Sequence, residues 1–181
     1  MKLAVFSLNG RRSVGAVRDE MIFDISDESP HFGSLESLLF ARRDGLEFAR
    51  RALDTGSGIA LSRVTLHAPI QHPSKFLAIA ANYQSHIDEV LATNSGYVPP
   101  VFQRWLAKLP SCINDPYAPI LMPPETSALD YEAELAIVIG RRCRRGKPED
   151  AAGVIAGYTI CNDVSARDWQ KSSPTIMLGK T

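Results

Sequence analysis

The sequence predicts a mixed α/β protein in which a small N-terminal α+β unit precedes a second unit that is rich in strands. Three observations support this. Short apolar runs separated by turn residues open the chain, two helical patches follow, and two near-continuous apolar runs lie beyond a proline-containing boundary. Runs of the last kind are typical of strands buried inside a domain.

The N-terminal unit should begin with an antiparallel meander. The runs KLAVFSL, RRSVGAV and MIFDI are separated by Asn9-Gly10 and then by the polar stretch RDE. Asn-Gly favours a two-residue hairpin turn. Two short helices are expected next, one over SLESLLFA from Ser34 and one from about Asp44. Asp44 and Glu47 have the spacing of a capping box ahead of EFARRAL.

A domain boundary is predicted near residue 70. The segment VTLHAPIQHPSK contains Pro69 and Pro73, which interrupt regular structure. We therefore expect an N-terminal domain over residues 1–70 and a second domain over residues 71–181.

The second domain should open with a buried strand over KFLAIAAN and continue as a helix over YQSHIDEVLA. On that helix His86 and Glu89 are three residues apart and share a face. The carboxylate could then orient and polarise the imidazole, which is what a general base needs. A surface ion pair has the same spacing, so the residues alone leave both interpretations open.

The segment DYEAELAIVIG, residues 130–140, predicts a strand that is apolar on both faces and carries two carboxylates at its start. Glu132 and Glu134 point the same way, because side chains alternate along a strand. Burying two like charges side by side is costly unless a cation is present. The alternative is that the start of the strand protrudes into water.

The segment GYTICNDVSARDWQ predicts a short strand, Tyr158 to Cys161, with Asp163 at its end and a helical turn beyond it. Glu132, Glu134 and Asp163 would together offer oxygen ligands. These suit a hard cation such as Mg²⁺, Mn²⁺ or Ca²⁺. Alternatively, Asp163 caps the helical turn or pairs with Arg167.

Composition excludes several classes of function. Twenty basic and twenty acidic residues leave no formal net charge, which argues against nucleic-acid binding and against a membrane-surface preference. No apolar run is long enough for a membrane span or has the form of a signal peptide. The basic cluster around Arg144 is expected to be a solvated turn. Three cysteines without CxxC spacing predict neither a disulfide framework nor a zinc site, and they fit a reducing cytoplasm.

Four segments together resemble a known family. AIAANYQSHIDE, DYEAELAIVIG, GYTICNDVSARDWQ and LGKT occur in the same order as four motifs of the fumarylacetoacetate hydrolase superfamily. The resemblance runs from about Lys75 to Thr181. It is specific for the superfamily and poorly specific for the substrate.

The resemblance implies a mainly β fold, the β-roll catalytic domain of the family, preceded by a small α+β domain. It makes Glu132, Glu134 and Asp163 the ligands of a divalent metal, with Asp130 nearby. The resemblance also implies that His86 and Glu89 form a water-activating dyad on a mobile lid. Lys180 would be a cation near the reacting carbonyl, and Lys108 and Gln170 would contact the substrate.

The implied activity is metal-dependent hydrolysis of a carbon–carbon bond in a 2-oxo acid such as an acylpyruvate. The metal would bind the substrate and stabilise the departing enolate. The same site could serve an isomerase, a tautomerase, a hydratase or a decarboxylase, since a fold does not determine the reaction.

Two departures from the family pattern affect these expectations. The stretch LATNSGYVPPVFQR is longer than the family pattern predicts, which affects the lid. The sequence also stops after the matched Lys180, so an incomplete catalytic domain is expected, with Lys180 on a fraying terminus. Unpaired strand edges would then favour association, either as a homodimer or as a non-catalytic fragment that acts only through association.

Overall fold

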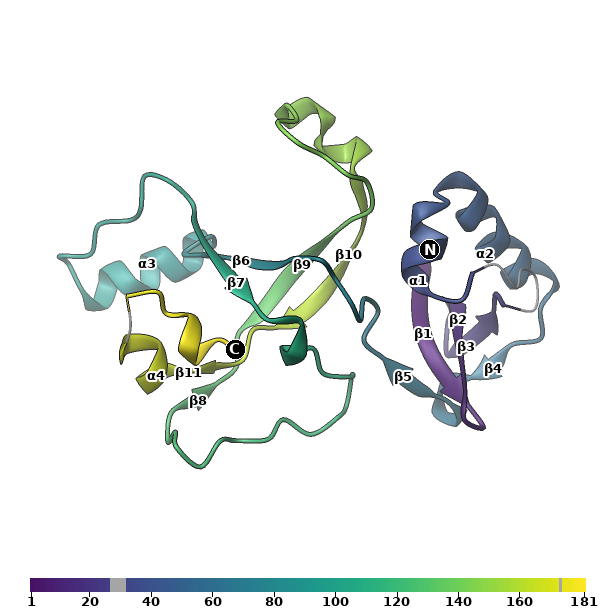
Figure 1. Cartoon of the computed structure of the whole chain (residues 1–181), viewed down its shortest axis with the longest axis horizontal. Coiled ribbons are helices and arrows are strands. Elements are labelled where there is room, and N and C mark those ends of the chain that lie inside the picture. Colours follow the sequence, from purple (N-terminus) through teal and green to yellow (C-terminus); the bar gives the residue numbers. More distant parts are fainter. Residues whose placement is uncertain (27–31, 173) are drawn as a thin grey trace. The chain divides into compact units, whose positions relative to one another are not determined.

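The structure is a computed structural model that describes residues 1–26, 32–172 and 174–181. It contains two compact units, each assembled from separate stretches of the chain. Figure 1 labels the helices and strands. Unit 1 comprises Met1–Gln71, Asn114–Ile120 and Ala133–Cys161. Unit 2 comprises His72–Ile113, Leu121–Glu132 and Asn162–Thr181. Among the described residues, no helix is both long and apolar enough to cross a membrane.

Strands outnumber helices in the described residues, as expected for a mixed α/β fold that is mainly β. The first part of the chain forms β1 (Lys2–Leu8), β2 (Arg11–Arg18), β3 (Met21–Asp24), α1 (Leu35–Phe40), α2 (Arg43–Thr55), β4 (Ile59–Ala60) and β5 (Thr65–His67). The rest forms β6 (Phe76–Ala80), α3 (Gln84–Thr93), β7 (Arg104–Lys108), β8 (Leu129–Asp130), β9 (Ala133–Ile139), β10 (Ile155–Asn162), β11 (Ser165–Ala166) and α4 (Arg167–Ser172).

The N-terminal meander is confirmed. Strands β1 to β5 form one sheet in the order β4-β3-β2-β1-β5, and its described pairings are antiparallel. Asn9 and Gly10 both have positive φ, 51° and 80°, and Leu8 pairs with Arg11 across the turn. This is the backbone that a two-residue hairpin needs, and glycine adopts it at little cost.

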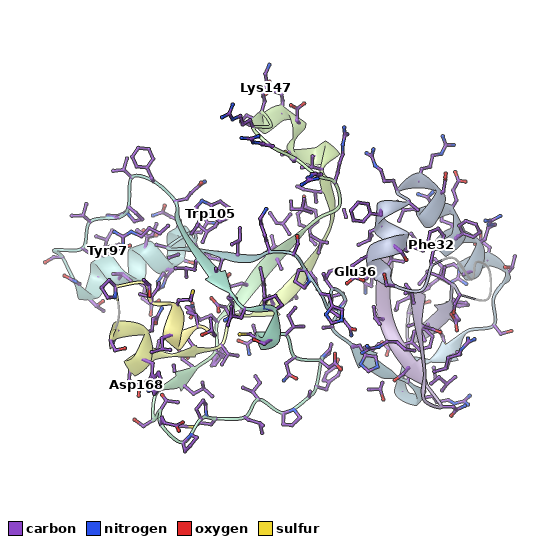
Figure 2. All side chains as sticks on the ribbon, in the orientation of Figure 1. Phe32, Glu36, Tyr97, Trp105, Lys147 and Asp168 are labelled. Carbon is purple, nitrogen blue, oxygen red and sulfur yellow. The ribbon has the colours of Figure 1, made fainter. Side chains whose placement is uncertain are left out.

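Helices α1 and α2 pack on this sheet and complete a small core. The expected start of α1 is confirmed: the Ser34 hydroxyl accepts from the Ser37 backbone N–H. Phe32, labelled in Figure 2, packs edge-on against Phe48. Their ring centroids are 5.4 Å apart. The buried core residues are Val5, Val14, Ala16, Phe23, Ile25, Leu35, Leu38, Ala49 and Ala52.

The expected capping box of the second helix is wrong. Helix α2 begins at Arg43, and the residue before it, Arg42, makes no side-chain cap. Asp44 already lies in the first turn, where a carboxylate interacts favourably with the helix dipole. Glu47 accepts from Arg43 Nε at 3.0 Å, one turn earlier on the exposed surface.

Unit 2 is built from short strand pairs. Strands β6 and β7 are antiparallel, and Phe76 pairs with Lys108. Strand β11 pairs with β8 through Ser165 and Asp130. The expected helix over YQSHIDEVLA is confirmed as α3. The helical turn expected beyond Asp163 begins only at Arg167, as α4, because Ser165 and Ala166 first pair with β8 as strand β11.

Strands β9 and β10 form a two-stranded sheet that is exposed on one face. The backbone N–H of Gly140 donates to Val154 O, and that of Asp163 donates to Glu132 O. These bonds join opposite ends of the two strands, so the pair is antiparallel. The expectation of burial on both faces is wrong, since Leu135, Ile137 and Ile139 are exposed together with Tyr158 and Ile160.

Asp115 should contribute to the acid stability of unit 1. Its carboxylate accepts from the backbone N–H of Ala68 at 2.8 Å and contacts His67 Nδ1 at 2.7 Å. The hydrogen bond with His67 is the main reason why the pKa of Asp115 lies below 3.8. A depressed carboxyl pKa stabilises the folded state above the unfolded pKa, and this stabilisation is lost as the pH falls through the folded pKa.

We therefore expect Asp115→Asn to lower the free energy of unfolding at pH 7 and to flatten its dependence on pH in the acid range. Urea unfolding between pH 3 and pH 7 measures both effects. A variant at Asp54, an exposed residue of α2, is the matched control. Equal acid slopes for wild type and Asp115→Asn would contradict the prediction.

Candidate functional site

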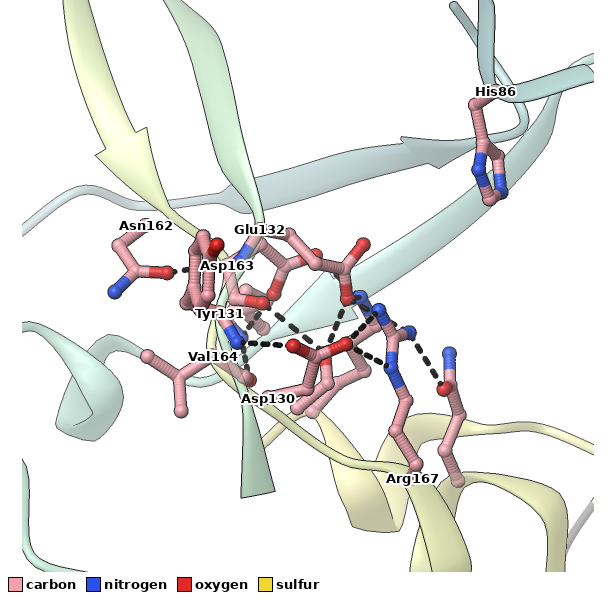
Figure 3. Close-up of polar contacts among 12 residues, drawn as sticks. His86, Asp130, Tyr131, Glu132, Asn162, Asp163, Val164 and Arg167 are labelled. Atoms are coloured by element: carbon pink, nitrogen blue, oxygen red, sulfur yellow. Dashed lines mark hydrogen bonds and ion pairs between the residues drawn. The ribbon is translucent and has the colours of Figure 1, made fainter. Parts of the chain in front are cut away.

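The site lies at the ends of the segments that flank β9 and β10 in the chain. Glu132 directly precedes β9 and Asp163 directly follows β10. Besides the backbone bond between them, the Glu132 N–H donates to Asn162 Oδ1 at 3.1 Å. Two carboxylates more than 30 residues apart in the chain are therefore held at one end of a strand pair (Figure 3).

The three predicted metal ligands lie together. Glu132, Glu134 and Asp163 each offer one carboxylate oxygen, and these oxygens all lie within 4.8 Å of one another. Glu134 follows Glu132 by two residues and points to the same side, as the alternation of a strand requires. The alternative that the start of the strand is fully solvated does not hold, because the Glu132 side chain is only 25 % exposed.

Two buried lysines neutralise this acidic cluster. Lys180 Nζ lies 2.5 Å from Glu132 Oε1 and 2.7 Å from Asp163 Oδ2. Lys108 Nζ lies 2.5 Å from Asp163 Oδ1. The side chains of Lys108, Lys180 and Asp163 are 6 %, 4 % and 4 % exposed. The expectation of a fraying Lys180 is therefore wrong, since two ion pairs hold its ammonium group.

Arg167 forms a second layer of positive charge. Its guanidinium contacts Asp130 Oδ2 through Nε and Nη2, at 2.9 and 2.8 Å, and Glu132 Oε1 through Nη1 at 3.0 Å. The same Nη1 lies 3.0 Å from Gln170 Oε1. The pKa of Asp130 is lowered, mainly by the hydrogen bond from Arg167. Arg167 thus pairs with Asp130 and Glu132, and Asp163 pairs with the lysines instead.

Two further residues of this region received no role from the sequence. The Ser165 hydroxyl is fully buried and donates to Glu132 Oε1 at 2.5 Å. Asp168 accepts from the Thr126 hydroxyl at 2.6 Å, the largest cause of its lowered pKa, and this bond ties α4 to the segment before β8. Both residues lie within the motif SARD, which was the signal that could have identified them.

The two residues of the predicted dyad lie near each other, apart from the acidic cluster. His86 Nδ1 and Glu89 Oε2 are 3.9 Å apart on α3, and the His86 side chain is 58 % exposed. Figure 3 shows His86 away from the carboxylates, with no polar contact drawn to them. This is the distance of a loose surface ion pair rather than of a hydrogen bond, so the dyad and its part in a reaction stay predictions.

The donor set fits a hard divalent cation. Three carboxylate oxygens converge from two strand ends, and no cysteine or histidine belongs to the cluster. Mg²⁺, Mn²⁺ and Ca²⁺ prefer such ligands. In the structure two of these carboxylates are paired with the ammonium groups of Lys108 and Lys180 and with the Arg167 guanidinium.

The family model described as "Fumarylacetoacetate (FAA) hydrolase C-terminal" matches residues 75–181. The chain belongs to this family.

Relatives in the family have several activities. The chain is 42 % identical over 140 residues to oxaloacetate tautomerase fahd2 of Xenopus laevis, covering 75 % of this chain and 42 % of the relative. A solved fumarylacetoacetate hydrolase from Exiguobacterium antarcticum matches at 31 % identity with a TM-score of 0.81, covering 100 % of this chain and 62 % of the other. This chain therefore spans only part of the length of the relatives that it matches.

A third match bears on the metal. Maleylpyruvate hydrolase from a Sphingobium species, solved with manganese(II) and pyruvate, is 26 % identical with a TM-score of 0.74. The match covers 92 % of this chain and 60 % of that one.

Proposed function

We propose that the site binds a 2-oxo acid at a divalent cation held by Glu132, Glu134 and Asp163, and that it catalyses keto–enol tautomerisation of that acid. The observation that carries the proposal is the pair of contacts that place the Lys180 ammonium between Glu132 and Asp163. A cation held at this position can stabilise the negative charge of an enolate. The tautomerase activity of a relative that is 42 % identical supports this choice.

The chain's own residues would divide the work. A bound divalent cation would supply a Lewis acid for the carboxylate and keto oxygens of the substrate. Arg167 and Lys180 would donate to the developing enolate oxygen, and Lys108 would hold Asp163 in its orientation. Gln170 would orient Arg167 rather than contact the substrate, because its oxygen lies against the guanidinium.

The direct test is the conversion of enol-oxaloacetate to the keto form, followed by the decay of enol absorbance with and without Mg²⁺ or Mn²⁺. We expect metal-dependent acceleration by the wild-type chain and none by Glu134→Gln. Substitution of Glu149, an exposed carboxylate of the β9–β10 turn, is the control. Equal rates for wild type and Glu134→Gln would reject the proposal and favour a chain that acts only through association.

Carbon–carbon bond hydrolysis of an acylpyruvate is the second candidate, and the fold shared with a maleylpyruvate hydrolase favours it. This reaction needs an activated water. The sequence predicts that His86, oriented by Glu89, is the base that activates it. Because His86 is exposed and apart from the carboxylates, α3 would have to close over the site as a lid.

The two reactions can be separated with one variant. If the chain is a hydrolase, His86→Ala should abolish pyruvate release from acetylpyruvate while Mn²⁺ binding is unchanged. If it is a tautomerase that works without the dyad, the enol decay rate should survive the substitution. Pyruvate release that persists in His86→Ala would contradict the proposed role of the dyad.

We also propose that the chain forms a homodimer through the exposed face of β9 and β10. The face carries Leu135, Ile137, Ile139, Tyr158 and Ile160 without a charged side chain among them. Contiguous apolar surface of this kind typically marks an interface. A second copy presents the same uncharged surface, so the contact can be two-fold symmetric.

Ile160→Lys should therefore convert a dimer into a monomer. Ile160 is 83 % exposed, so the substitution should leave the fold of one copy intact while placing a charge in the interface. Sedimentation velocity measures the change, and Val98→Lys, at another exposed apolar residue, is the control. A monomeric wild type, or dimers in both variants, would contradict the dimer.

A further inference from the structure

A second cluster of reactive side chains lies in unit 1, on the N-terminal sheet. Ser7 on β1 lies opposite Thr65 on β5, and His67 lies two residues further along β5. His67 is therefore a diagonal neighbour of Ser7 on the same face of the sheet. Ser7 Oγ and His67 Nε2 are 2.9 Å apart, which is hydrogen-bond distance.

Asp115 completes a relay from carboxylate to imidazole to hydroxyl. Its Oδ2 lies 2.7 Å from His67 Nδ1, and its Oδ1 accepts from the Ala68 N–H at 2.8 Å. In the neutral Nδ1–H tautomer, His67 donates to the Asp115 carboxylate and its Nε2 accepts from the Ser7 hydroxyl. The His67 side chain is 14 % exposed, which shields this relay without closing it to solvent.

Arg12 adds a cation to this face of the sheet. It pairs with Ser7 across β1 and β2, so the two side chains share a face. Arg12 Nη1 donates to Gln71 Oε1 at 2.7 Å on the exposed surface. Arg12 also contributes to the lowered pKa of Asp115, so its charge acts on the cluster.

We propose that Ser7, His67 and Asp115 form a nucleophilic acyl-transfer site, distinct from the acidic centre, that takes carboxylic esters. Its geometry has two of the features that define such a site: a nucleophile at hydrogen-bond distance from a base, and a base bonded to an orienting carboxylate. In the proposal, Arg12 on the same face supplies the donor for the carbonyl oxygen.

The reaction is balanced with an ester and water alone. Ser7 Oγ bonds to the carbonyl carbon while the hydroxyl proton passes to His67 Nε2, and Asp115 stabilises the imidazolium. The carbon–oxygen bond to the alcohol then breaks, and the alcohol leaves with that proton. Water, deprotonated by the same nitrogen, attacks the acyl-Ser7 ester, which releases the acid and restores the hydroxyl.

A fluorophosphonate probe tests the proposal on the full chain, because it forms a stable adduct only with an activated serine. We expect one adduct by intact mass, mapped to Ser7 by peptide analysis, and at least a tenfold loss of labelling rate in His67→Ala and in Asp115→Asn. Ser57→Ala, at an exposed serine away from the cluster, should label as wild type does.

Circular dichroism shows whether each variant is folded. If His67→Ala and Asp115→Asn do not fold, Ser7→Ala still tests the proposal, because it removes only a single hydroxyl. p-Nitrophenyl acetate supplies a second readout, with hydrolysis expected to fall to background in Ser7→Ala. A folded wild type without an adduct at Ser7 overturns the proposal. So does labelling that is equal at several serines, or that persists in folded His67→Ala. None of these outcomes depends on the acidic centre.

Discussion

Asp163→Ala should lower the free energy of unfolding by about 3–5 kcal/mol, the usual cost of removing one partner of a buried ion pair. Asp163 lies between two ammonium groups, at 2.5 Å from Lys108 Nζ and 2.7 Å from Lys180 Nζ, and all three side chains are almost fully buried. Without the Asp163 carboxylate, Lys180 retains its ion pair with Glu132. Among the described residues, Lys108 retains only its contact with Val164 O at 3.4 Å.

Urea unfolding at pH 7 measures this cost. The matched control is Asp54→Ala, at an exposed carboxylate of α2, which should change stability by no more than about 0.5 kcal/mol. High salt should not abolish the difference in unfolding free energy between wild type and Asp163→Ala, since buried ion pairs are screened much less than surface ion pairs. An Asp163→Ala variant as stable as wild type would show that the two lysines can leave the site.

Loss of the Asp163 carboxylate should also remove metal binding. Loss of a residue that only supports a metal ligand typically weakens affinity by about 10- to 100-fold, so loss of a ligand should cost at least about 100-fold for Mn²⁺. Calorimetric titration of folded Asp163→Asn, which retains the shape of the side chain, separates this effect from unfolding. Unchanged Mn²⁺ affinity would exclude Asp163 as a ligand.

The parts of the fold that the sequence predicts well depend on local interactions. The turn at Asn9-Gly10 requires positive φ at two neighbouring residues, and the start of α1 depends on Ser34 and its own first turn. Glu132 and Glu134 share a side because strands alternate, whatever surrounds them. The error at α2 is also local, because a helix former at Arg43 extends the helix one residue ahead of the expected cap.

The rest depends on contacts between distant residues. Nothing near Lys108 in the chain indicates that its partner is Asp163, 55 residues later. The exposure of Ile137 and Ile160 could not be predicted either, because periodicity shows that a face is apolar but not whether other residues cover it. The Ser7–His67–Asp115 cluster joins three segments whose sequences carry no shared motif.

Lys180→Met should have opposite effects on catalysis and on metal binding. Its ammonium lies within 2.7 Å of both Glu132 and Asp163, where it competes with a metal for the same carboxylates. Methionine keeps much of the length and apolar character of the side chain but removes the charge. Mn²⁺ should therefore bind more tightly to the variant than to wild type, since the three carboxylates repel one another more strongly without the lysine.

Turnover should nevertheless fall, by about 10²- to 10³-fold in kcat, which is the usual cost of removing one preorganised donor to a developing oxyanion. The enol-oxaloacetate assay at saturating Mn²⁺ gives kcat, and titration of the same preparation gives the affinity. Lys171→Met, at an exposed lysine of α4, should change neither. If Lys180 only neutralised the acidic cluster, saturating metal would replace its charge and kcat would be restored. A kcat that stays low while Mn²⁺ binds more tightly is therefore the result that assigns Lys180 to the reaction itself.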